Sequence, residues 1–172
     1  MITKNQLKTL VLILAGLVST LKAQDKFSLS SLAFQNGKAI PAKYTCADKN
    51  ILPSLSWNNI PQTTKSFAII MDDPDAPMGT WVHWVIYNIP VNVTALSEGS
   101  TAAEVKANDG LNSWETKGYQ GPCPPNGTHN YIFKIYALDT ILSISDMSKD
   151  KLLESMKDHV IAQAQLNGTF EM

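Results

Sequence analysis

The chain has 172 residues, enough for one domain with a substantial core, and its 44% hydrophobic and 17% charged content is ordinary for a globular protein. The formal net charge of −1 argues against nucleic-acid binding. All 14 basic residues are lysines, so no arginine can clamp a phosphate or carboxylate with a guanidinium group. Any bound anion must be held by backbone N–H groups, histidine, tyrosine or lysine.

Residues 1–23 have the pattern of a secretory signal peptide. Lys4 and Lys8 precede a short apolar run at 10–18, which is too short to span a bilayer. Cleavage after Ala23 would leave 24–172 as a single domain, although Leu21 at the −3 position leaves the exact cleavage site open. We therefore expect an exported protein, periplasmic or secreted, with no stable membrane insertion.

Short apolar or alternating segments predict several β-strands. Residues 66–72 are apolar at nearly every position, which is typical of a strand buried on both faces. The next strand should pair with it in antiparallel fashion, because only a short, turn-rich link separates the two. Between 94 and 118 the chain is polar and reads as a long loop. The predicted strands are 27–34 (with a bend), 52–57, 66–72, 83–89 and 131–138.

One helix is predicted near the C-terminus, at 148–167. Ser148 can cap its N-terminus, apolar residues recur at helical spacing, and Gly168 suits the position just after a helix. Strands that precede a single helix, without βαβ alternation, indicate a mostly β fold with antiparallel sheets in a sandwich.

Three acids and a histidine lie where no structural core requires them. Asp72 ends the strand at 66–72 and Asp73 and Asp75 follow it. His83 begins the next strand, on the face that Val85 and Tyr87 share. A glycine- and proline-rich segment at 118–127 then leads into the strand that carries His129 and Tyr131. We expect these two regions to meet at one end of the sheet.

The predicted site therefore combines carboxylates, imidazoles and a phenol between rigid walls. A nearby carboxylate favours a protonated imidazole, and His⁺ with backbone N–H groups can bind an anion. Because the carboxylates repel a fully ionised ligand, we expect a small, partly protonated anion that binds weakly. The candidate residues are Asp73, Asp75, Pro77, Trp81, His83, Gly121, Pro124, Pro125, His129 and Tyr131.

Two cysteines follow the predicted signal peptide. In an oxidising compartment Cys46 and Cys123 are free to form a disulfide, but geometry decides whether they do. A bridge and a pair of buried free thiols both remain open on the sequence alone.

Two separated motifs resemble those of the phosphatidylethanolamine-binding protein family, in its bacterial and archaeal Raf-kinase-inhibitor-like branch. The first is Asp-Pro-Asp-Ala-Pro at 73–77 followed by His-Trp, and the second is Gly-Tyr-x-Gly-Pro-Cys-Pro-Pro-x-Gly-x-His-x-Tyr-x-Phe at 118–133. The resemblance runs from about Phe27 to the C-terminus. It implies a Greek-key β-sandwich with a C-terminal helix, small peripheral helices and an anion pocket at one end. It also implies binding of phosphate, phosphorylated head groups or acetate-like anions, and some relatives inhibit proteases or kinases.

One position departs from the family pattern. Asn130 stands where the family usually has an arginine that helps to fix the acidic loop. Either Asn130 or a lysine must take over that role, or the pocket is looser and binds anions more weakly.

The leading functional hypothesis is a non-enzymatic binding protein without a cofactor. It would hold a small anion or phosphorylated small molecule, and it could act on a protein partner such as a protease. One alternative is a metal-dependent enzyme that uses Asp73, Asp75, His83 and His129, a plausible ligand set. The other is a serine protease inhibitor, although no reactive loop is recognisable.

Overall fold

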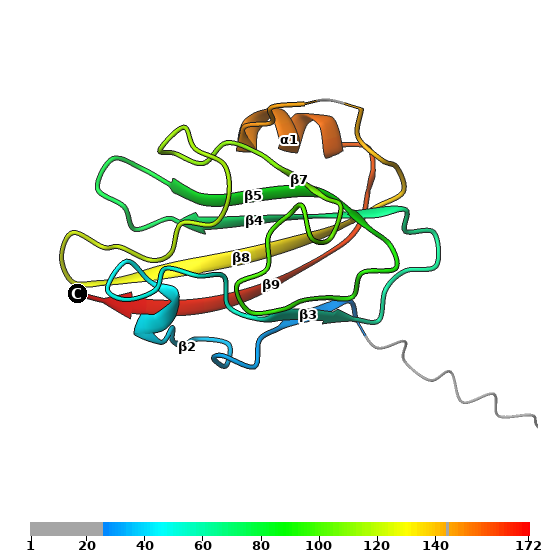
Figure 1. Ribbon diagram of the computed structural model, residues 1–172. Coiled ribbons are helices and arrows are strands. Elements are labelled where there is room, and N and C mark those ends of the chain that lie inside the picture. The colour runs from blue at the N-terminus through cyan, green and yellow to red at the C-terminus, as the bar shows by residue number, and fades with distance from the viewer. Residues whose placement is uncertain (1–25, 144) are drawn as a thin grey trace, which may run out of the picture.

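The computed structural model describes residues 26–143 and 145–172. The predicted signal peptide lies outside this range. The fold is mostly β, in a three-stranded and a six-stranded sheet (Figure 1). The three-stranded sheet has the order β1-β3-β6, and the six-stranded sheet has the order β2-β9-β8-β4-β5-β7. The elements are β1 Ser28–Ser30, β2 Lys38–Ala39, the 3₁₀ turn η1 Ala42–Tyr44, β3 Leu55–Asn58, β4 Ser66–Asp73, β5 Trp81–Pro90, β6 Ala95–Leu96, β7 Asn108–Asp109, β8 Thr128–Leu138, α1 Lys149–Met156 and β9 Val160–Glu171.

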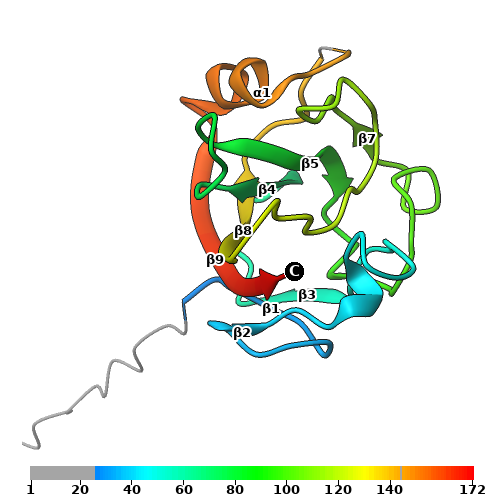
Figure 2. The same cartoon turned by 90° about the vertical axis from the view of Figure 1, so that its left-hand side faces the viewer.

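The core has two parts, one on each side of the six-stranded sheet. The larger part lies between the two sheets, where Trp57 of β3 meets Phe67 of β4 edge-on at 5.4 Å between ring centroids. The smaller part lies between the opposite face and α1, and it includes Ile70 and Leu152. Figures 1 and 2 show α1 and the three-stranded sheet on opposite sides of β4. Both faces of β4 are therefore covered, which confirms the prediction of a strand buried on both faces.

The strand pairing confirms a mostly β fold with an antiparallel central sheet. β4 pairs antiparallel with both β5 and β8, while the two-residue strand β2 pairs parallel with β9. The Greek-key sandwich arrangement stays a prediction. No helix of the described residues is long and apolar enough to cross a membrane.

The predicted C-terminal helix at 148–167 is wrong over its second half. Ser148 caps α1 by accepting a hydrogen bond from the Lys151 N–H, but the helix ends at Met156 and the chain continues as strand β9. From Ala162 to Leu166 small or apolar residues alternate with glutamine, and this two-residue period places the apolar side chains on the core. Pairing along the whole of β8 outweighs the helical spacing that the same residues also satisfy.

Gly168 does not end a helix, as predicted, but lies inside β9. A Cβ atom there would stand 2.5 Å from Cγ1 of Ile40, so the glycine lets Ile40 pack directly on the strand. Strand β1 is also shorter than predicted, because the chain leaves the extended conformation after Ser30.

Candidate functional site

A β-bulge in β5 places His83 in the site. Met71 pairs with Trp84 and Asp72 pairs with Val82, so His83 is the extra residue. Its ring meets that of Tyr131 edge-on at 5.2 Å, on the side of the larger core, whereas Val85 lies in the smaller core. The prediction that His83, Val85 and Tyr87 share a face is wrong, because the bulge shifts the alternation by one residue.

Asp73 and His129 form a buried pair at the adjoining ends of β4 and β8. His129 Nδ1 donates to Asp73 Oδ2 at 2.7 Å, and the side chains are only 8% and 5% exposed, respectively. The backbone N–H of Asp75 donates to Asp73 Oδ1 at 2.9 Å. The strand ends therefore bring the acidic motif and the histidine motif together, as the sequence predicts.

His83 presents one ring nitrogen for binding. Its Nδ1 lies 2.9 Å from the Gln120 carbonyl and 3.1 Å from that of Gly121, so Nδ1 carries the proton and donates. Burial, the largest effect, lowers the pKa of His83, although nearby Asp73 opposes the shift. His83 is therefore neutral near neutral pH, with Nε2 as an acceptor, and the expected protonated imidazole does not hold for this residue.

A cavity of about 280 Å³ opens beside Asp73 and His83. Five predicted residues line it together with four that were not predicted. Trp114 is the most informative omission, since its ring packs edge-on against both Trp81 and His83. A tryptophan within the otherwise polar segment 94–118 was the available signal. The lining residues are Asp73, Pro77, Trp81, His83 and Pro125, joined by Ala76, Met78, Trp114 and Cys123.

The other predicted residues do not line the cavity; they are Asp75, Gly121, Pro124, His129 and Tyr131. A disulfide joins Cys123 to Cys46, which settles the alternative that the sequence left open. Gly121 is required beside it, because a Cβ atom there would stand 2.2 Å from the Tyr44 carbonyl oxygen. The buried Tyr131 hydroxyl lies beside Asp73 and makes no hydrogen bond of good geometry to a described residue. Burial and the Asp73 charge raise its pKa, so Tyr131 stays a neutral phenol.

Asn130 takes over the contact with the acidic loop. Its backbone N–H and its Nδ2 each donate to Asp75 Oδ2 at 2.8 Å, and these bonds lower the pKa of Asp75. Lysines instead compensate Asp72, which faces the other side of the sheet. Lys149 lies 2.8 Å and Lys134 3.5 Å from Asp72 Oδ2. Of the two substitutes that the sequence suggests, only Asn130 therefore contacts the acidic loop, while the lysines pair with Asp72 in β4.

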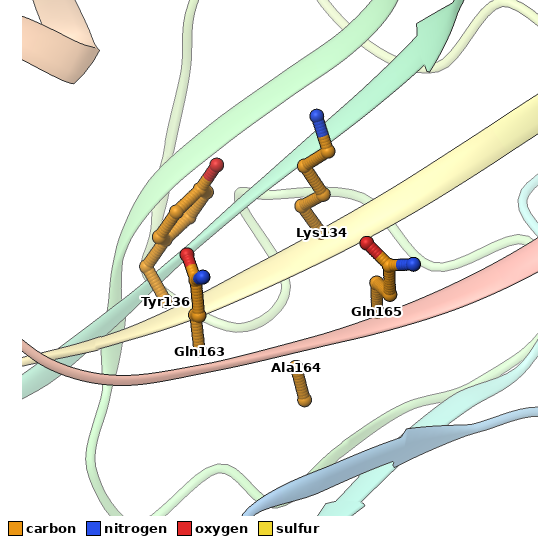
Figure 3. Close-up of a pocket in the computed structure, with 5 residues that line it drawn as sticks. All are labelled: Lys134, Tyr136, Gln163, Ala164 and Gln165. Carbon is orange, nitrogen blue, oxygen red and sulfur yellow. The ribbon is translucent and has the colours of Figure 1, made fainter.

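A second hollow of about 360 Å³ lies over β8 and β9 and is a poorer candidate. Figure 3 shows Lys134, Tyr136, Gln163 and Gln165 on the same side of the two strands. This open, polar sheet face lacks the buried Asp–His pair and the aromatic walls of the first cavity. Its one ammonium group already faces Asp72.

The arrangement does not favour the metal-enzyme alternative. Among the described residues, no three His, Cys, Asp or Glu side chains converge as metal ligands. Asp75 is turned to Asn130, and His129 Nδ1 is committed to Asp73. Cys123 forms a disulfide and offers no thiolate nucleophile.

Comparisons with known proteins agree on one family. A family model described as phosphatidylethanolamine-binding protein matches residues 30–171. A UPF0098 protein of Methanothermobacter thermautotrophicus is 46% identical over 147 residues, covering 83% of this chain and 97% of the relative. A UPF0098 protein of Chlamydia trachomatis is 44% identical over 149 residues, with the same coverage.

Two crystal structures share the fold. CT736 of Chlamydia trachomatis, described as a phosphatidylethanolamine-binding protein homologue, has a TM-score of 0.82 at 42% identity, covering 86% of this chain and 98% of that one. YbcL of E. coli, described as a new member of the mammalian PEBP family, has a TM-score of 0.78 at 32% identity, covering 86% and 99%.

Proposed function

Because the chain belongs to the phosphatidylethanolamine-binding protein family, we propose that it is a binding protein for a small anion or phosphorylated head group, held beside Asp73 and His83. The observation that carries the proposal is the cavity in which the buried Asp73–His129 pair adjoins the available Nε2 of His83. At about 280 Å³ it is slightly below the usual size range of ligand pockets, so it suits a head group.

The polar groups of the cavity determine which protonation state binds. Both the Asp73 carboxylate and neutral His83 Nε2 accept hydrogen bonds, so a fully ionised phosphate meets no donor from either. A bound phosphate group must bring its own proton, or His83 must take one up when the anion arrives. We therefore propose that binding is linked to proton uptake and strengthens as the pH falls.

The walls support binding without catalysis. Pro77 and Pro125 are rigid, and Trp81 packs against Trp114, so little side-chain freedom is lost when a ligand enters. We propose no catalytic residue, because the site offers no activated nucleophile: Cys123 is in a disulfide and Tyr131 is a high-pKa phenol.

Calorimetry with phosphate, phosphoethanolamine and acetate tests this function. We expect saturable heat with at least phosphate, and a titration in two buffers of different ionisation enthalpy should show net proton uptake. Asp158→Asn, on an exposed side chain away from the cavity, is the control and should not alter the heat. Absence of heat with all three ligands, together with unchanged His83 NMR signals, would refute the proposal.

Export is part of the proposal and has independent support. The Cys46–Cys123 disulfide suits an oxidising compartment, because thiols in the cytosol are kept reduced. Cell fractionation and N-terminal sequencing of the mature protein test it; an intact Met1 on cytosolic protein would refute export.

A partner protein at the cavity mouth is a second candidate role. Met78 is 92% exposed and Trp114 is 43% exposed at this rim, where a partner such as a protease could cover them. An inhibition assay against serine proteases, with Met78→Ser as the matched variant, separates this role from small-molecule binding.

A further inference from the structure

Another cavity, distinct from the cavity of His83 and from the hollow over β8 and β9, lies next to the segment that contacts His83. Gly118 and Tyr119 line it, while the next two residues, Gln120 and Gly121, turn their carbonyls to His83. Its volume is about 200 Å³, which restricts a ligand to a few heavy atoms. Its walls come from β5, β7 and the loops at 50–52, 99–102 and 118–119.

Asp109 in this cavity lacks a cationic partner. Its side chain accepts one long hydrogen bond, from Trp84 Nε1 at 3.4 Å, and within the described residues it forms no ion pair. The lysine that influences it, Lys117, is paired with Asp146 at 2.7 Å. Burial raises the pKa of Asp109, so its carboxylate loses hydration without full compensation.

A second polar group in the cavity wall, the Ser100 hydroxyl, lacks a hydrogen-bond partner among the described residues. Its oxygen atom is buried. By contrast, the Asn50 side chain is fully engaged, donating to Gln120 and accepting from the Gly121 N–H. Buried polar groups are normally paired, so the unpaired Ser100 hydroxyl indicates a missing ligand, and it lies in the same cavity as the half-buried, poorly compensated Asp109 carboxylate.

Aromatic rings supply the apolar part of the wall. Trp84 and Tyr119 meet edge-on, with ring centroids 6.0 Å apart and planes at 81°. Aromatic faces attract organic cations, and a carboxylate beside such rings supplies the counter-charge. A metal ion fits less well, because no three carboxylate, imidazole or thiol ligands converge in the described part of the chain.

We propose that this cavity binds a small organic ammonium ion, with Asp109 as its counter-ion, Trp84 and Tyr119 as aromatic walls and Ser100 as a hydrogen-bonding partner. The site is separate from the cavity of Asp73 and His83 and does not depend on its function. The two cavities are close along the chain, since Trp84 of the one follows His83 of the other in β5.

The indole N–H signals of the protein can report on the two cavities separately. Trp84 lines the ammonium cavity, Trp81 and Trp114 line the other, and Trp57 lies in the core as an internal reference. After assignment by single Trp→Phe variants, choline is titrated into the unmodified full-length protein. We expect a saturable shift of the Trp84 signal and no shift of the Trp81 and Trp114 signals.

The ligand control is dimethylbutanol, the uncharged carbon isostere of choline. We expect choline to bind at least tenfold more tightly, because only choline compensates Asp109. Asp109→Asn should reduce the choline affinity at least tenfold, whereas Asp73→Asn and the exposed Asp158→Asn should leave it unchanged. An unmoved Trp84 signal, equal binding of both ligands, or full affinity in a folded Asp109→Asn variant would each overturn the proposal. The ligand comparison in the unmodified protein decides the matter if that variant does not fold.

Discussion

Asp72 and Asp73 are consecutive buried residues at the end of β4, yet they face different sides of the sheet. Asp72 faces α1 and is paired with the ammonium groups of Lys149 and Lys134. Asp73 faces the cavity, where it is paired with His129 and lies near His83, whose pKa is lowered by burial and whose Nε2 is available to a proton or a ligand. The comparison teaches that the helix side has a fixed charge balance, whereas a proton or a ligand can alter the balance on the cavity side.

The largest effect is expected from the disulfide, which supports the cavity side only. The Cys46→Ser, Cys123→Ser double variant releases a loop with a sequence separation of 77 residues. The free energy of unfolding should fall by about 4.5 kcal/mol on the chain-entropy model, and phosphate should bind more weakly because Cys123 lines the cavity. Urea denaturation and calorimetry measure the two effects. The unmodified protein under reducing conditions is the control, and a loss of stability below about 1 kcal/mol would contradict the prediction.

Asp72→Asn should remove the negative charge that pairs with Lys149 and Lys134, and it should leave phosphate binding unchanged. Lys149 is only 21% exposed and would lose its closest anionic partner, while Lys134, at 35%, can reach solvent. We expect the free energy of unfolding to fall by about 2 kcal/mol, less than for a fully buried pair. Asp146→Asn is the matched control, since its pair with Lys117 is exposed and its loss should hardly change the free energy of unfolding. An equal effect of the two substitutions in urea denaturation would argue against this role of Asp72.

Asp73→Asn should have the opposite effects to Asp72→Asn, a small change in stability and a large change in phosphate binding. An asparagine can still accept the hydrogen bond from His129, so the stability should change less than in Asp72→Asn. The charge beside His83 is lost, however. The ratio of the phosphate affinity at the lowest pH to that at the highest pH should therefore differ at least tenfold between Asp73→Asn and the unmodified protein. Calorimetry on both variants over the same pH range tests the contrast. Identical pH profiles of phosphate affinity would show that the two acids are not functionally distinct.

The sequence predicts much of this arrangement because strand alternation is local. It predicts the buried strand β4 and the meeting of the Asp73 and His129 motifs. It does not predict the bulge at His83, which depends on pairing between β4 and β5. The sequence also fails to predict strand β9, because its apolar residues satisfy both the helical and the strand period and only pairing with β8 decides between them.

Some site residues were missed for a different reason. Trp114 and Met78 lie in loops, where no periodicity indicates the direction of a side chain. Asn130 was recognised as a departure, but its contact with Asp75 required the geometry of both loops. Contacts between loops distant in sequence therefore marked the limit of prediction from the sequence.

A smaller effect should appear in the pH dependence of stability. Burial lowers the pKa of His83 in the folded protein, so below the unfolded value of about 6.5 the unfolded state binds more protons at this residue. Its contribution therefore makes stability fall as the pH decreases below that value, by at most about 1.4 kcal/mol per pH unit. His83→Asn should reduce this slope, and saturating phosphate should reduce it in the unmodified protein. Thermal denaturation across this pH range measures both, and a slope that neither change affects would show that His83 is not neutral in the free protein.

The smallest effect concerns Asn130, where the neutral amide can be compared with the arginine of the family pattern. Asn130→Ala removes one hydrogen bond to Asp75 but keeps the backbone one, so stability should fall by only about 0.5 kcal/mol. Asn130→Arg keeps a donor and adds a positive charge beside the acidic loop, so it should raise phosphate affinity by about twofold to threefold at low salt. Calorimetry at low and high salt measures both variants, with the exposed Asn126→Ala as control. Because a charge effect on an exposed loop is screened by salt, a gain that persists at high salt would mean that Asn130→Arg acts by changing the loop geometry.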